Sequence, residues 1–280
     1  MKNLFSGFFL PSLFLSISLL ISSLARGADV SFDITPTVGI MHYKYQEKYA
    51  TTDDVKWSDN IPFVGINLGI GYKNFSIDVS AQQSDSVKDG LFSEKSGLRT
   101  DITADLSRTD YAVNVGYKIR TSELLNKLLF IGDDGSGDSL SFFTGYKMSQ
   151  SEITELDRRT SGSGIFFKHY TQFETTGPFL GMAYGRPIGE RSNVGISLAY
   201  AWLDTDYTST RQAVTADSTD GLTVSLKWSF SLTRNWTYSL SIDGYRYKMD
   251  ARPDRKENKS EMSSIEESVI NLKSLFIYSF

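Results

Sequence analysis

The chain has 280 residues, a net charge of −4 and no cysteine. Disulfides therefore cannot hold it, and it depends on its own core or on a membrane. The mildly acidic charge, with no block of basic residues, argues against nucleic acid as a partner.

The first segment predicts a secretory signal peptide over residues 1–27. Lys2 precedes an uncharged stretch rich in Leu, Phe and Ser, and Ala25 and Gly27 form a small-residue cleavage site. A retained anchor is the alternative because the stretch is long for a signal, but Pro11 and the serines favour cleavage. Residues 28–280 are then expected to form one domain, in which no apolar run approaches the ~20 residues of a membrane helix.

The remaining chain alternates apolar residues with small or polar ones. In residues 62–72, for example, Val64, Ile66 and Leu68 share one face and glycines share the other. Successive strand side chains point to opposite faces, so each segment has one apolar face. Ten such segments are predicted strands: 30–45, 62–72, 74–84, 106–120, 139–149, 172–185, 193–204, 220–232, 236–249 and 267–280.

Alternation alone also fits a soluble sandwich. Two further features favour a membrane. The non-apolar faces consist mostly of Gly, Ser, Thr, Ala and Asn, which suits a crowded barrel interior. Aromatic residues gather near the segment ends: Tyr72, Phe75, Tyr117, Trp228, Trp236, Tyr238, Tyr278 and Phe280 at one end, and Tyr111, Tyr200 and Trp202 at the other. The sequence therefore predicts an all-β protein, an antiparallel up-and-down transmembrane β-barrel of about ten strands.

The connections alternate in length, as in outer-membrane barrels with short periplasmic turns and long outer loops. Short turns are expected at 73–74, 185–192 and 233–235, and long polar loops at 46–61, 85–105, 150–171, 205–219 and 250–266. The connection 121–139 is too long for a turn and predicts an amphipathic helix at the membrane edge followed by a flexible link. A hidden hairpin there, or in 85–105, would raise the count to twelve strands.

The last ten residues, 271–280, carry a resemblance. Tyr278 and Phe280 alternate to an aromatic end, and this segment resembles the terminal strand of Gram-negative outer-membrane proteins. The resemblance implies an integral position in outer-membrane lipid, and recognition of Tyr278 and Phe280 by the barrel-assembly machinery. The alternative is the last strand of a soluble periplasmic sandwich.

A ten-stranded barrel of this length also resembles the omptin proteases, whose site pairs an Asp–x–His with two acids. Here Asp204 and Asp206 stand where an acid and a histidine should be, and Asp85 lacks an acidic neighbour. The only histidines are His42 and His169, so a rebuilt His169–Asp204 site is one alternative. A lipid-modifying barrel enzyme, using His, Ser and an acid, is another. We assign no catalytic residue and expect no enzymatic activity.

Neither a cofactor nor a metal ion is expected. The chain lacks cysteine and its two histidines are far apart in sequence. Residues 132–138 superficially resemble a calcium loop but lack its spacing and its terminal Glu. A flexible turn is the preferred interpretation.

Charged and aromatic residues are predicted inside the barrel. Lys227, Asp243 and Lys273 lie on three consecutive predicted strands and could form one lumen cluster. Together with inward-facing Phe143 and Phe179 they favour a closed or narrow lumen, whereas the many inward glycines leave room for water. Ten strands are close to the eight at which side chains fill a barrel.

The expected function is a structural or surface-interaction role. The barrel would display polar extracellular loops, with an extracellular or host-surface molecule as a possible partner. A small, porin-like passive channel is the alternative.

Overall fold

A computed structural model describes residues 30–49, 55–94, 102–120, 137–158, 166–209, 214–253 and 262–280. They form ten strands: β1 (Val30–Tyr49), β2 (Val55–Tyr72), β3 (Phe75–Glu94), β4 (Ile102–Arg120), β5 (Ser139–Arg158), β6 (Phe166–Ile188), β7 (Ser192–Ser209), β8 (Val214–Ser231), β9 (Trp236–Pro253) and β10 (Met262–Ser279). The described part of the chain contains no helix long and apolar enough to span a membrane. The predicted signal peptide and the helix predicted after residue 120 lie outside the described residues.

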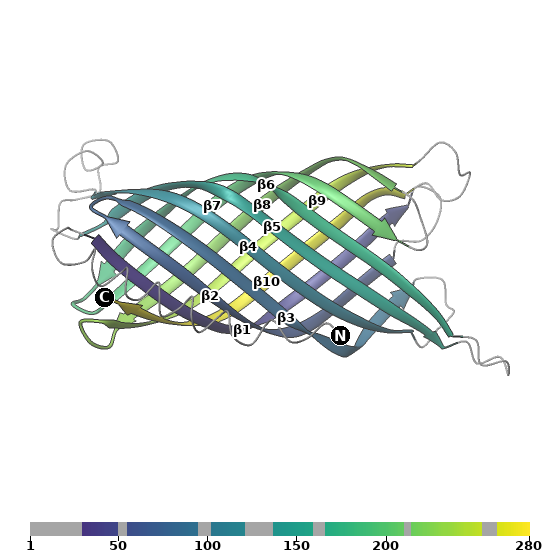
Figure 1. Cartoon of the computed structure of the whole chain (residues 1–280), viewed down its shortest axis with the longest axis horizontal. Coiled ribbons are helices and arrows are strands. Elements are labelled where there is room, and N and C mark those ends of the chain that lie inside the picture. The colour runs from purple at the N-terminus through teal and green to yellow at the C-terminus, as the bar shows by residue number, and fades with distance from the viewer. Residues whose placement is uncertain are drawn as a thin grey trace, which may run out of the picture.

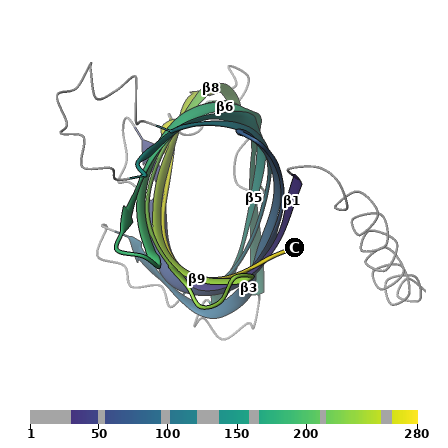
Figure 2. The ribbon, with the colours of Figure 1, turned by 90° about the vertical axis from the view of Figure 1, so that its left-hand side faces the viewer.

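The strands form one closed antiparallel barrel. Each strand pairs with its neighbours in sequence, and β1 pairs with β10 to complete the ring. Figure 1 shows the strands tilted against the long axis, and Figure 2 shows the closed oval ring along that axis. The prediction of an up-and-down barrel with ten strands is confirmed, and the twelve-strand alternative is wrong.

The two ends of the barrel differ. Short turns at 73–74, 189–191 and 232–235 join strands at one end, where β10 also finishes (Figure 1). We call it the turn end, and the opposite end the loop end. Lys73 and Gly189 have positive φ angles of 53° and 70° in two of these turns, which tight reversals require.

The strands reach further toward the loop end than predicted. β1 continues to Tyr49 and β2 begins at Val55, inside the predicted loop 46–61. The other four predicted loops are shortened in the same way by strands β3 to β10. The loop boundaries were therefore wrong, and on strands such as β1 the cause is a change in the amphipathic pattern along the strand.

That change concerns which face is apolar. On β1, Val38 and Ile40 are exposed on the barrel exterior, whereas Met41 and Tyr43 are completely buried inside. Nearer the turn end apolar side chains thus face outward, as lipid contact requires, and nearer the loop end they face inward, as in a soluble barrel. The outward-facing residues near the turn end form an exposed apolar belt around the barrel.

The inward-facing apolar residues fill the barrel near the loop end. They form one buried cluster of twelve side chains, which we call the plug: Met41, Tyr43, Tyr45, Trp57, Ile61, Phe63, Leu106, Ile153, Phe173, Met249, Ile265 and Val269. They come from β1, β2, β4, β5, β6, β9 and β10, so the plug spans the lumen from wall to wall.

Candidate functional site in the barrel interior

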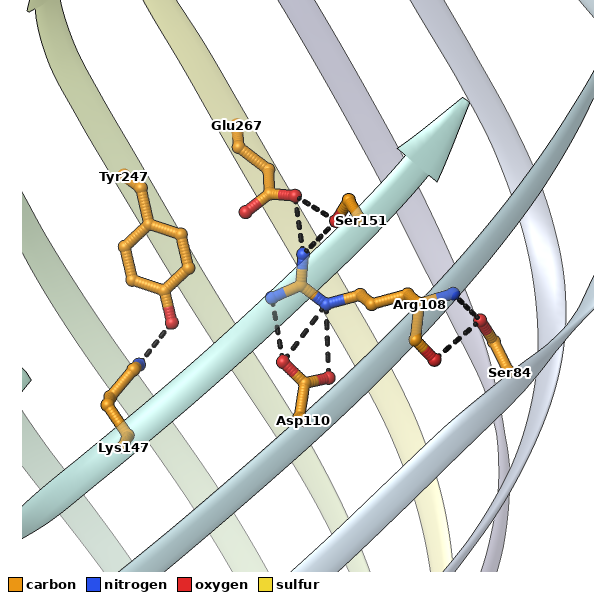
Figure 3. Close-up of polar contacts among 7 residues, drawn as sticks. All are labelled: Ser84, Arg108, Asp110, Lys147, Ser151, Tyr247 and Glu267. Carbon is orange, nitrogen blue, oxygen red and sulfur yellow. Dashed lines mark hydrogen bonds and ion pairs between the residues drawn. The ribbon is translucent and has the colours of Figure 1, made fainter. Parts of the chain in front are cut away.

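A buried ionic network adjoins the plug and is centred on Arg108 (Figure 3). Its guanidinium donates three hydrogen bonds of 2.8–3.1 Å to Asp110, on the same strand. It also pairs with Glu267 on β10, across the lumen, and neither the Arg108 nor the Glu267 side chain has any exposed surface. Ser151 accepts from Arg108 at 2.8 Å and donates to Glu267 at 2.7 Å. Buried charges need such partners, so the network fixes β4, β5 and β10 relative to one another.

Tyrosine rings lie close to two cations inside the barrel, Arg108 and Lys147. The Arg108 guanidinium lies 5.9 Å from the ring centroid of Tyr43 and 5.2 Å from that of Tyr245. Lys147 lies 4.5 Å from the ring centroid of Tyr247 and donates a hydrogen bond to its hydroxyl (Figure 3). The faces of aromatic rings attract cations, so these rings stabilise charge where water is excluded.

The three residues of the predicted lumen cluster lie inside the barrel, but they are not equivalent. Lys273 pairs with Asp243 at 2.7 Å, and Ser225 donates to the same carboxylate. In the strand register Lys227 and Lys273 both pair with Ser241. Lys227 makes no ion pair shorter than 4 Å in the described part of the chain. It interacts at longer range with Asp243 and with carboxylates nearer the turn end.

Two cavities lie inside the barrel between the plug and the turn end. One, of about 390 Å³, is bordered by Asp243, Lys273 and Phe179. The other, of about 410 Å³, includes Asn74 of a turn-end connection and shares Phe143 with the first. The Phe143 and Phe179 rings meet edge to face at 6.2 Å. The interior is therefore hollow toward the turn end, where both polar and apolar side chains line it, and filled by the plug toward the loop end.

Known structures share this architecture. Neither a protein-family model nor a curated protein matches the chain. The outer-membrane protease OmpT from Escherichia coli is similar in structure, with a TM-score of 0.61 and 12% sequence identity over 89% of this chain and 97% of that one. The outer-membrane protein OprG from Pseudomonas aeruginosa aligns with a TM-score of 0.35 and 12% identity, over 90% of this chain and 98% of that one. This chain has the fold of an outer-membrane β-barrel. The fold assignment rests on OmpT, and at 12% identity the likeness to it extends to the fold alone.

The residues of the omptin-like alternative are not brought together in this barrel. Asp204 and Asp206 lie on the exterior of β7, exposed and alternating with inward-facing residues. His42 also faces outward, on β1, where its Nδ1 lies 2.9 Å from Asn60 Oδ1. His169 is seven residues along β6 from Thr176, the partner of Asp204, which is roughly 23 Å of strand.

No single site therefore contains both histidine and these acids. The Asp85 side chain lies outside the described residues. Among the side chains that are described, no group of three or more His, Asp or Glu residues could hold a metal ion.

Sequence reasoning missed the plug and most of the Arg108 network. Trp57 and Ile61 lie in a segment predicted as loop, and Arg108 was not singled out. The available signal was an inward-facing alternation of Met41, Tyr43 and Tyr45, opposite in phase to Val38 and Ile40 on the same strand. Only a reading that allowed the apolar face to change within one strand would have found it.

Proposed function

We propose that this protein is a closed barrel of the outer membrane with a structural or surface-interaction role. The observation that supports this proposal is the plug, because twelve buried apolar side chains from seven strands cross the lumen. Water and ions need polar or hydrated walls, and a dry constriction blocks them.

The length of the strands favours a surface role. They contain 18 to 23 residues, whereas a membrane strand needs about 9–11. With the loop end outward, roughly half of each strand would stand above the bilayer. The plug would act as the core of that projecting part, which would present the connecting loops to an extracellular or host-surface partner.

A narrow channel is the second candidate, and the two cavities, which charged and polar side chains help to line, favour it. They would form the inner part of a pore that opens only when the plug rearranges. Among the described side chains, no arrangement favours an enzyme in the same way.

Planar-bilayer recordings test the two functions. The purified protein should give no stable conductance steps. Removing plug side chains in the double variant Trp57→Ala/Phe63→Ala should create steps by connecting the cavities to the loop end. The control is Val64→Ala/Ile66→Ala on the same strand, which truncates the outward belt and should stay silent. Stable steps from the unmodified protein would overturn the closed-barrel proposal in favour of the channel.

A further inference from the structure

Charge is distributed unevenly around the barrel exterior beyond the apolar belt, at the loop end. On β9, β10, β1 and β2 the described outward-facing charges are Arg246, Lys248, Asp250, Glu266, Lys44, Lys48 and Lys56. On β4 to β8 they are Asp105, Glu152, Glu174, Asp204, Asp206 and Asp220. The first face, which we call the basic face, has five cations against two acids, whereas the second has only acids among its described side chains.

One row of the basic face contains hydrogen-bond donors on every strand. In the register, Arg246 of β9 pairs with Ser268 of β10, Ser268 with Lys44 of β1, and Lys44 with Ser58 of β2. Neighbouring strands lie ~4.8 Å apart, so Arg246 and Lys44 are about 10 Å apart with a serine between them. Their long side chains can converge on one anion above that serine.

The acid nearest this row is already paired. Glu266 lies one row further toward the loop end, where it accepts a hydrogen bond from Arg246 at 2.6 Å and another from Lys48. Burial alone would raise the pKa of Glu266, but these hydrogen bonds outweigh that effect and lower the pKa. Lys44 has no ion-pair partner within the described ranges. Glu266 thus engages part of the Arg246 guanidinium, but its single negative charge is shared by Arg246 and Lys48. Together with Lys44, these three cations leave a net positive charge on this part of the basic face.

A second observation concerns the aromatic girdle. On β4, β5 and β7, the loop-end edge of the belt is marked by exposed aromatic residues, which are Tyr111, Tyr146, Tyr200 and Trp202. At the loop-end edge of the belt the described outward positions of β9, β10, β1 and β2 include no aromatic side chain, and the Arg246–Ser268–Lys44–Ser58 row lies two residues beyond exposed Ile270. Two residues correspond to about 7 Å along the strand, which is comparable to the thickness of the lipid headgroup region. Cationic and hydroxyl groups thus replace aromatic ones at the interface.

We propose that the row Arg246, Ser268, Lys44 and Ser58 binds the phosphate group of a lipid in the outer leaflet. The Arg246 guanidinium and the Lys44 ammonium would neutralise the phosphate, and the Ser268 hydroxyl between them would donate to one of its oxygens. The acyl chains of the lipid would lie along Ile270 and Ile40 of the belt. This inference depends on the transmembrane orientation, and it holds whether or not the lumen conducts.

Native mass spectrometry of the full chain tests the site. The protein is released from vesicles of phosphatidylcholine mixed with phosphatidylglycerol, and the retained lipids are identified. The unmodified protein should retain phosphatidylglycerol in preference, because its glycerol headgroup leaves the phosphate charge unbalanced. In the double variant Lys44→Gln/Arg246→Gln that preference should fall by about fivefold for each cation removed. Ser268→Glu, which places a carboxylate in the row, should abolish it.

The matched control is Lys73→Gln/Arg234→Gln, which removes the same charge from exposed turns at the turn end and should leave the preference unchanged. Equal loss in both double variants would mean that net charge alone attracts the lipid and would overturn the site. Displacement of the lipid by inorganic phosphate would assign the row to free anions instead. Charge-dependent dimers in place of bound lipid would mean that the basic face binds the acidic face of a second copy, which would also overturn the proposal.

Discussion

Arg108 and Asp243 carry charge inside the same barrel but in different environments. The pair of Arg108 with Glu267 is fully enclosed, whereas the side chains of Lys273 and Asp243 remain 21% and 15% exposed at the cavity. Desolvation makes an unpaired charge costly only where water cannot reach it. The two ion pairs should therefore respond differently to loss of one partner.

Glu267→Ala should lower the free energy of unfolding by about 3–5 kcal/mol, because it leaves the Arg108 charge buried with Asp110 as its remaining acid. Replacing both members in Arg108→Met/Glu267→Met should recover much of that loss. Asp243→Ala should cost less, because cavity water can solvate Lys273. Urea unfolding in lipid vesicles measures all three. An Asp243→Ala cost as large as that of Glu267→Ala would mean that the cavity is dry.

Two adjacent residues of β8 test the assignment of faces. Leu226 is 51% exposed on the belt, and Ser225 faces the lumen beside Asp243. Arginine on the lipid face near mid-membrane costs roughly 2–4 kcal/mol, whereas Ser225→Arg places the new cation beside a carboxylate. Leu226→Arg should therefore reduce folding into bilayers more than Ser225→Arg, as measured by unfolding titrations. The reverse order of effects would mean that the assignment of inward and outward faces on β8 is off by one residue.

At this scale the sequence predicted the outward face well, because Leu226 and its neighbours alternate without interruption in the belt. It also pointed to Lys273 and Asp243, since charges on an inward face are few. It could not predict that Asp243 pairs directly with Lys273 rather than with Lys227, because both lysines sit opposite the same residue of β9. Only side-chain geometry distinguishes them.

At the scale of the element, one strand can contain two apolar segments, one that faces outward from the barrel and one that faces into its interior. On β10, Ile270 and Leu272 are exposed on the apolar belt, and Ile265 and Val269 are buried in the plug. The strand continues through the change without a break in its pairing with β9. The number of strands could be predicted because turns and the lipid-facing pattern repeat. The boundaries of the strands at the loop end could not be predicted, because the outward-facing apolar alternation stops where the apolar residues begin to face inward.

Equal truncations on β10 should therefore have unequal effects. Ile265→Ala leaves a space in a closed core and should cost about 2–5 kcal/mol. Leu272→Ala leaves a space that lipid chains can fill, so the cost should be clearly smaller. Urea unfolding of both variants in the same vesicles provides the comparison. Equal costs would indicate that Ile265 is not enclosed.

At the scale of the whole molecule, the closed ring and its belt predict behaviour on extraction. A barrel with every strand paired resists detergent unless it is heated. The folded protein should migrate differently on gels before and after boiling, and it should fractionate with the outer membrane. Recovery of intact protein from the soluble periplasm would contradict the membrane assignment.

The plug also has a consequence for biogenesis. Its side chains come from the first two strands and the last two as well as from the middle of the chain, so three of its twelve members, Met249, Ile265 and Val269, are missing until the final hairpin is made. An unfinished barrel would expose Trp57, Ile61 and Phe63 to water on its inner wall. Joining β1 to β10 would bury them at the moment the ring closes, which would make that last step strongly favourable and hard to reverse. A chain stalled before β9 should accordingly depend on a chaperone that shields these side chains.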